Sequence, residues 1–143
     1  MHRRQVGMGA QHLGVRREGL GSAARHPRQQ LAIKGAGAFP NAAKARVAIT
    51  RIEAANNEAL AALAASVAAG ARRAGAPPPD EGRKYRPHLT LARTREPANL
   101  SALVESLANY EGKTWQSAQI ELIRSFTGPA ARYEVLAAWP LKS

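Results

Sequence analysis

Cysteine is absent from all 143 residues, and this absence excludes several classes of chemistry. Without thiols the chain forms no disulfide, no zinc–cysteine centre and no iron–sulfur cluster, and it has no cysteine nucleophile. The same absence suits a reducing compartment, so we expect a cytoplasmic protein. Aromatic residues are also scarce, at 5% of the chain, so the core has to be built from Leu, Ile, Val and Ala.

Acidic residues are the next shortage. Only 10 Asp and Glu stand against 21 Lys and Arg, which gives a formal net charge of +11. Such an excess favours polyanionic partners, RNA above all, because cationic side chains neutralise phosphates. Much of the excess lies in residues 1–34, where seven basic residues accompany a single acid, Glu18. A solvated basic tail in front of an ordinary domain explains this distribution equally well.

Long hydrophobic runs are missing too. The most apolar stretch, around residues 59–69, is rich in alanine and too short to cross a bilayer. The arginines near the N-terminus are not followed by an apolar run, so they do not form a secretory signal. We therefore expect no membrane partner.

The length favours one folded domain, which we place at residues 30–143. Residues 1–29 are basic and rich in Gly and Arg, with almost no apolar periodicity, and we expect them to be disordered, loosely attached or aberrant. Periodicity in the remainder predicts an α+β fold with antiparallel sheets and outer helices. The expected strands are 30–35, 45–52, 85–92, 118–126 and 131–141, with a turn at 35–41. The first expected helix begins at Glu58 after Asn56 or Asn57 as cap, with an apolar stripe of Leu60, Leu63 and Val67, and Gly75 follows its end. The second runs from about Leu100 to Ala108, with Asn99 as cap and Leu103 facing inward.

The third expected strand, YRPHLTLAR at residues 85–93, carries the residues of chemical interest. Because side chains alternate along a strand, Arg86, His88 and Thr90 share one face, and the leucines bury the other. An imidazole moves protons near neutral pH, a hydroxyl donates a hydrogen bond to a phosphoryl oxygen, and arginine binds phosphate bidentately. Arg86, His88 and Thr90 on one face of the strand therefore predict a phosphate-binding site. On spacing alone, a histidine on the solvated face of a sheet is the commoner case and needs no functional explanation.

Arg93 is a further candidate for this site, although strict alternation directs it to the face of the leucines. It reaches the face of His88 only if the strand ends or kinks after Ala92.

YRPHLTLAR resembles the second signature motif of the two-histidine phosphoesterases, in the branch of RNA 2′,3′-cyclic phosphodiesterases and bacterial 2′-5′ RNA ligases. Upstream, LAIKGAGAFPNAAKARVAI resembles the strand–turn–strand that precedes the linking helix of those proteins. The closing IELIRSFTGPAARYEVLAAWPL resembles their C-terminal hairpin, with Ser125 and Tyr133 at familiar places. The resemblance spans about Ala23 to Leu141.

This resemblance implies a bilobal α+β fold with a pseudo-two-fold axis, in which each lobe contributes one His-x-Thr strand to a central cleft. One histidine activates water or a hydroxyl, the other protonates the leaving oxygen, and the threonines bind the phosphate without metal or cofactor. The implied substrate is an RNA 2′,3′-cyclic phosphate, opened to a 2′-phosphate, with 2′-5′ ligation as a related activity. His88 would then be the water-activating base, with Thr90 and Arg93 on the phosphate.

The sequence departs from this pattern upstream, where the family has its first His-x-Thr motif. The nearest candidate is His12, but Gly14 stands where the hydroxyl should be; His26, followed by Pro27, has no hydroxyl two residues on either. Two explanations stay open. Either the first thirty residues are read from a wrong start or frame, so that the N-terminal lobe is incomplete, or the chain is a variant that has lost half of its active site.

The leading hypothesis is a metal-independent cyclic phosphodiesterase acting on RNA ends, impaired if the first motif is truly lost. The alternative is a non-catalytic RNA-binding module that uses the same basic cleft, and a third interpretation, association with ribosome or nucleoid, rests on charge alone. The alternatives differ in turnover, and in whether cyclic and linear RNA ends are distinguished.

Overall fold

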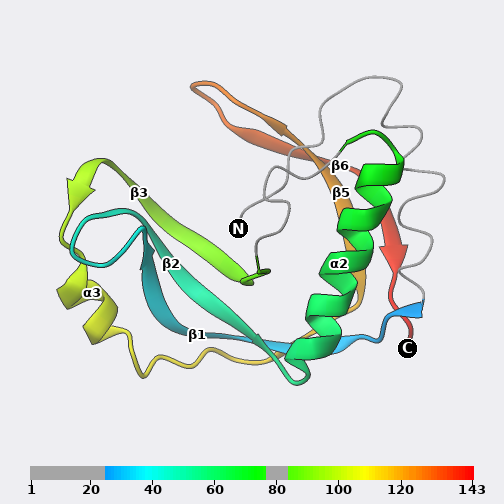
Figure 1. Ribbon diagram of the computed structural model, residues 1–143, viewed down its shortest axis with the longest axis horizontal. Coiled ribbons are helices and arrows are strands. Elements are labelled where there is room, and N and C mark those ends of the chain that lie inside the picture. The colour runs from blue at the N-terminus through cyan, green and yellow to red at the C-terminus, as the bar shows by residue number, and fades with distance from the viewer. Residues whose placement is uncertain (1–24, 77–83) are drawn as a thin grey trace. The chain divides into compact units, whose positions relative to one another are not determined.

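The computed structural model describes residues 25–76 and 84–143 (Figure 1). The expectations for residues 1–24, including the candidate His12, lie outside these residues. The described chain divides into two compact units. The first contains residues 30–55 and 86–116, and the second contains residues 25–29, 56–76, 84–85 and 117–143. The elements are β1 (Gln29–Phe39), β2 (Ala45–Ala54), α2 (Asn57–Arg73), β3 (His88–Ala98), α3 (Ser101–Ser106), β4 (Trp115–Ser117), β5 (Gln119–Phe126) and β6 (Arg132–Pro140).

The first unit is built on a four-stranded sheet with the strand order β3-β2-β1-β4. Both β1 with β2 and β2 with β3 pair antiparallel, which confirms the predicted α+β class. Ala48, Ile49 and Thr50 in the central strand β2 are all buried, so both faces of this strand are covered. Strand β3 lies at the edge of the sheet. Pro87 immediately precedes it and has no N–H, which an edge position tolerates because one side of the strand has no neighbour to accept a hydrogen bond.

Strand β1 is longer than the sequence predicts, and the expected turn at 35–41 is wrong for residues 35–39. The strand continues through Gly35 to Phe39, because Gly35 adopts a φ of 61° and the register with β2 shifts between Lys34 and Gly37. The Thr50 hydroxyl donates a hydrogen bond of 2.6 Å to the Gly35 carbonyl oxygen, which holds this irregular position. The turn itself follows Phe39, where the Asn41 side chain accepts a hydrogen bond from the Lys44 amide.

Helix α3 is shorter than the predicted Leu100–Ala108. Asn99 does accept a hydrogen bond from the Ser101 amide, but the residue in the N-cap position is Leu100, which offers no side-chain oxygen. Leu103, expected to face inward, is 40% exposed. The short strand β4 was not predicted, since three residues give too little periodicity to detect.

The second unit packs α2 against the β5–β6 hairpin. Asn56 caps the helix by accepting from the Ala59 amide, and Gly75 follows its end with a φ of 80°, both as predicted. The predicted stripe of α2 forms the core with the hairpin and the C-terminus. The members of this core are Leu60, Leu63 and Val67 of the helix, together with Ile120, Leu122, Trp139 and Leu141.

Residues just before β1 belong to this second unit. The backbone of Pro27 forms a parallel bridge to Lys142, and the Arg28 amide donates to the Lys142 carbonyl oxygen at 3.0 Å. In the part of the chain that the structure describes, no helix is long and apolar enough to cross a membrane.

Candidate functional site

His88 opens β3 and is half-buried. Its Nδ1 atom lies 2.6 Å from the carbonyl oxygen of Arg86. A carbonyl oxygen can only accept, so Nδ1 carries a proton, and the neutral ring has its lone pair on Nε2. This backbone contact therefore selects the tautomer in which Nε2 can act as a base.

Phe39 provides a second contact to this imidazole. The two rings meet edge to face, with centroids 5.4 Å apart and planes inclined at 74°. Phe39 comes from β1, on the far side of β2 from β3, so its ring reaches across the middle strand. The sequence offered no signal for this contact, because it depends on the order of strands in the sheet.

Thr90 shares the face of His88, since the two lie two residues apart in a stretch of regular pairing with β2. Its hydroxyl oxygen is buried, and among the described residues it has no hydrogen-bond partner. A buried hydroxyl without a partner costs about 1–3 kcal/mol, so a ligand that pairs with it is favoured. Contact with a ligand requires either rotation of the side chain or displacement of the atoms that cover it.

Arg93 is turned toward the same face by an extra residue in β3. Ile49 lies opposite Thr90, but Ala48 lies opposite Ala92 and Val47 opposite Arg93, so Leu91 is left without a partner. Val47 and Ile49 alternate regularly on one face of β2, and their partners share that face. The kink on which Arg93 depended is therefore present, and it falls at Leu91 rather than after Ala92. Leu91, expected to be buried, is 50% exposed for the same reason.

Arg86 was predicted to bind phosphate through its side chain. Its described role lies in the backbone, where its carbonyl oxygen orients His88. The side chain is exposed, and it precedes the first residue of β3. Its part in phosphate binding stays a prediction.

The candidate site residues lie inside a segment that matches the sequence profile of a known family. The family profile of the 2′-5′ RNA ligase superfamily matches residues 14–128, which is most of the chain and includes His88, Thr90 and Arg93. The chain belongs to the 2′-5′ RNA ligase superfamily. Members of this superfamily are generally enzymes that act on RNA, and the predicted relationship to the two-histidine phosphoesterases is confirmed.

A solved structure supports the fold. The crystal structure of TT0787 from Thermus thermophilus superimposes with a TM-score of 0.67 at 24% sequence identity, covering 96% of this chain and 74% of that one. At this identity the likeness speaks for the fold alone. The search of curated proteins finds no match.

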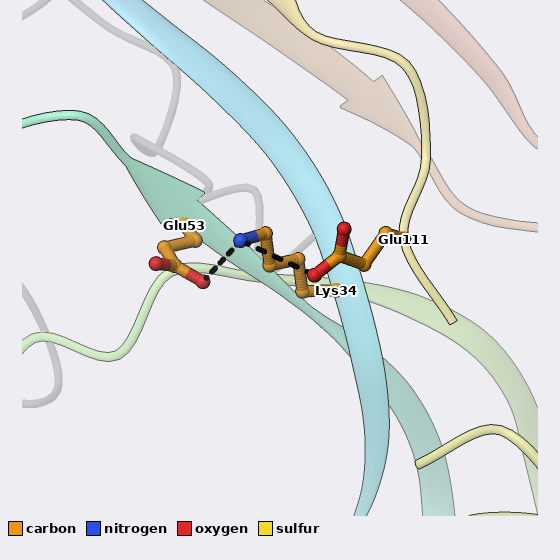
Figure 2. Close-up of polar contacts among 3 residues, drawn as sticks. All are labelled: Lys34, Glu53 and Glu111. Atoms are coloured by element: carbon orange, nitrogen blue, oxygen red, sulfur yellow. Dashed lines mark ion pairs between the residues drawn. The ribbon is translucent and has the colours of Figure 1, made fainter. Parts of the chain in front are cut away.

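Two further cationic residues lie in the same row across the sheet as His88. Arg51 of β2 lies directly opposite His88 in the register, and Lys34 of β1 lies opposite Arg51. Lys34 is paired with two carboxylates, Glu53 at 3.3 Å and Glu111 at 3.6 Å (Figure 2). A hydrogen bond to Glu53, and then the negative charges of Glu111 and Glu53, raise the pKa of Lys34 above its ordinary 10.5.

The other described histidine, His26, belongs to the second unit, where its Nε2 atom lies 2.8 Å from the Ser66 hydroxyl of α2. His12 lies outside the described residues and also precedes the matched region. No cluster of three or more His, Asp or Glu suited to a metal ion occurs among residues 25–76 and 84–143.

Proposed function

We propose that this chain opens 2′,3′-cyclic phosphates at RNA ends, leaving a 2′-phosphate. One observation carries the proposal above the others. His88 is held by the Arg86 carbonyl in the tautomer of a base, on the same face as the unpartnered Thr90 hydroxyl and the cationic residue Arg93. Family membership supplies the substrate class, RNA.

In the proposed reaction Nε2 of His88 takes a proton from water, and the water oxygen forms a bond to phosphorus. The bond between phosphorus and the 3′ oxygen breaks, which leaves the phosphate on the 2′ oxygen. Thr90 donates a hydrogen bond to a non-bridging oxygen, and Arg93 neutralises the charge that grows on these oxygens. All of these steps use side chains alone and need no metal ion.

The departing 3′ oxygen needs a proton from a second group. We assign this proton to a first-motif histidine, with His12 as the candidate. Ligation between 2′ and 5′ ends is the related activity, because it forms the same kind of phosphodiester at the same phosphate.

Hydrolysis of a nucleoside 2′,3′-cyclic phosphate tests the proposal. We expect His88→Ala to lower kcat by about 10²–10⁴-fold, the usual contribution of a general base. His26→Gln is the matched control and should keep the rate, since His26 contacts Ser66 in the other unit. A wild-type rate in the His88→Ala variant contradicts the proposal.

The second candidate function is RNA binding without turnover, which the net charge of +11 favours. It predicts binding that weakens steeply with salt and does not distinguish cyclic from linear RNA ends. Wild-type protein that binds both ends equally and hydrolyses neither would establish it.

A further inference from the structure

We infer that Arg51 binds a second phosphate of the substrate, so that the site prefers oligonucleotide ends to single nucleotides. This inference rests on the proposed function, and its first support is the pairing of Arg51 with His88. The Ile52 amide donates to the Pro87 carbonyl oxygen at 3.1 Å, and these residues flank the pair. Arg51 and His88 therefore form a non-hydrogen-bonded pair, in which the Cα atoms lie about 4.5 Å apart and the side chains are closest.

The second support is that acidic side chains compensate the charge of Lys34 but not that of Arg51. Arg51 is exposed and makes no ion pair with any described residue. Its nearest acid along β2 is Glu53, which shares its face two residues on. The carboxylate of Glu53 is instead directed to Lys34 (Figure 2), and Glu111 approaches the same ammonium group. The positive charge of Lys34 is thus compensated by carboxylates, while Arg51 keeps an uncompensated charge beside His88.

The third support is the position of Arg51 relative to the other phosphate ligands. Thr90 and Arg93 follow His88 along β3 and lie opposite Ile49 and Val47, on the side away from Glu53. Arg51 is four residues of β2 from Val47, or about 13 Å of strand. The two arginines therefore extend from opposite ends of the row, which suits two phosphates better than one.

An RNA end supplies these two groups. Its cyclic phosphate is the reacting group, and the phosphodiester on the 5′ side of the terminal nucleotide is the next phosphate along the chain. A nucleoside 2′,3′-cyclic phosphate has only the first. Arg51 would act through substrate binding, so its loss should raise KM for the longer substrate and leave kcat nearly unchanged.

The test compares a nucleoside 2′,3′-cyclic phosphate with a dinucleotide that ends in the same group. Arg51→Gln should lower kcat/KM for the dinucleotide about tenfold, which is the loss of one charge-assisted hydrogen bond, and should leave the mononucleotide unaffected. The matched control is Arg46→Gln. Arg46 is also exposed on β2 but lies on the opposite face, so neither substrate should change.

Equal losses on both substrates would place Arg51 on the reacting phosphate and overturn the inference, as would no loss on either. If the wild-type protein hydrolyses neither compound, the proposed function fails separately. Calorimetric binding of the same two compounds then decides the inference. A deficit of Arg51→Gln confined to the dinucleotide supports it, and equal binding by wild type and variant overturns it.

Discussion

Strands β3 and β6 each have a point at which one extra residue is inserted relative to the neighbouring strand, and the two units use this extra residue differently. In β3 it is Leu91, between the residues paired with Ile49 and Ala48. In β6 it is Leu136, since Ile123 pairs with Val135 and Leu122 with Ala137. Leu91 is 50% exposed, whereas Leu136 packs against the buried Leu122. The same backbone device turns Arg93 to the face of His88 in one unit and adds a leucine to the core in the other.

The arginines of the two units differ in a parallel way. In the β5–β6 hairpin, the guanidinium carbons of Arg124 and Arg132 lie 4.3 and 4.1 Å from the centroid of the Phe126 ring. These cations are held by an aromatic face. In the first unit, Arg51 and Arg93 make no ion pair or ring contact with described residues, and both are exposed. Cations that remain uncompensated near a histidine are suited to bind phosphate.

Of the predictions that follow from these contrasts, replacement of Arg93 should have the largest effect, and it tests the contrast between the arginines. Arg93→Gln should lower kcat/KM for a cyclic phosphate about 100-fold, or ~2.7 kcal/mol, because a charged ligand of the developing negative charge is lost. Arg124→Gln is the control and should leave kcat/KM unchanged, since that guanidinium stacks on Phe126. Equal losses in the two variants would show that the register shift at Leu91 does not direct Arg93 to the site.

The contrast between the extra leucines predicts a smaller effect, on stability. Leu136→Ala should lower the free energy of unfolding by about 2 kcal/mol, because a leucine in contact with the core is lost. Leu91→Ala should change it by less than about 0.5 kcal/mol, as expected at an exposed position. Urea denaturation measures both. A loss in Leu91→Ala as large as that in Leu136→Ala would mean that Leu91 is covered.

The smallest effect is a pH dependence that belongs to the first unit alone. The raised pKa of Lys34 means that its ion pairs stabilise the fold below pH 10.5 and that this stabilisation is lost as pH rises through the higher folded pKa. Lys34→Met should therefore lower the denaturation midpoint slightly at pH 8, and the difference from wild type should shrink above pH 10.5. Lys44→Met, at an exposed lysine without an ion pair among the described residues, should show neither effect.

Periodicity was a good guide to where elements lie. It predicted β2, α2 and both hairpin strands, and one of its two candidate caps, Asn56, does cap α2. It failed at Gly35, where a turn was expected and a strand with a register shift is found. Glycine permits both outcomes, and the pairing with β2 selects between them.

Some residues of the candidate site could be predicted from the sequence, and others could not. His88 and Thr90 could be named from the sequence because two residues of regular strand suffice to place both on one face. Phe39 and Arg51 could not, because Phe39 meets His88 from β1, across β2, and Arg51 is placed opposite His88 by the register of β2 with β3. The role of the Arg86 carbonyl was likewise hidden, since every residue has a carbonyl and only the folded backbone shows which one meets the ring.

The sequence by itself determined the fold class, the strand that carries the imidazole and the hydroxyl, and the positive charge that favours RNA. Only the tertiary structure decided that Arg93 joins that face, that Arg51 stands beside His88, and that Lys34 is neutralised. The reason is physical. Alternation along one strand is a local property of the backbone, whereas register between strands depends on pairing over the whole sheet, and a single extra residue reverses the face of every side chain beyond it.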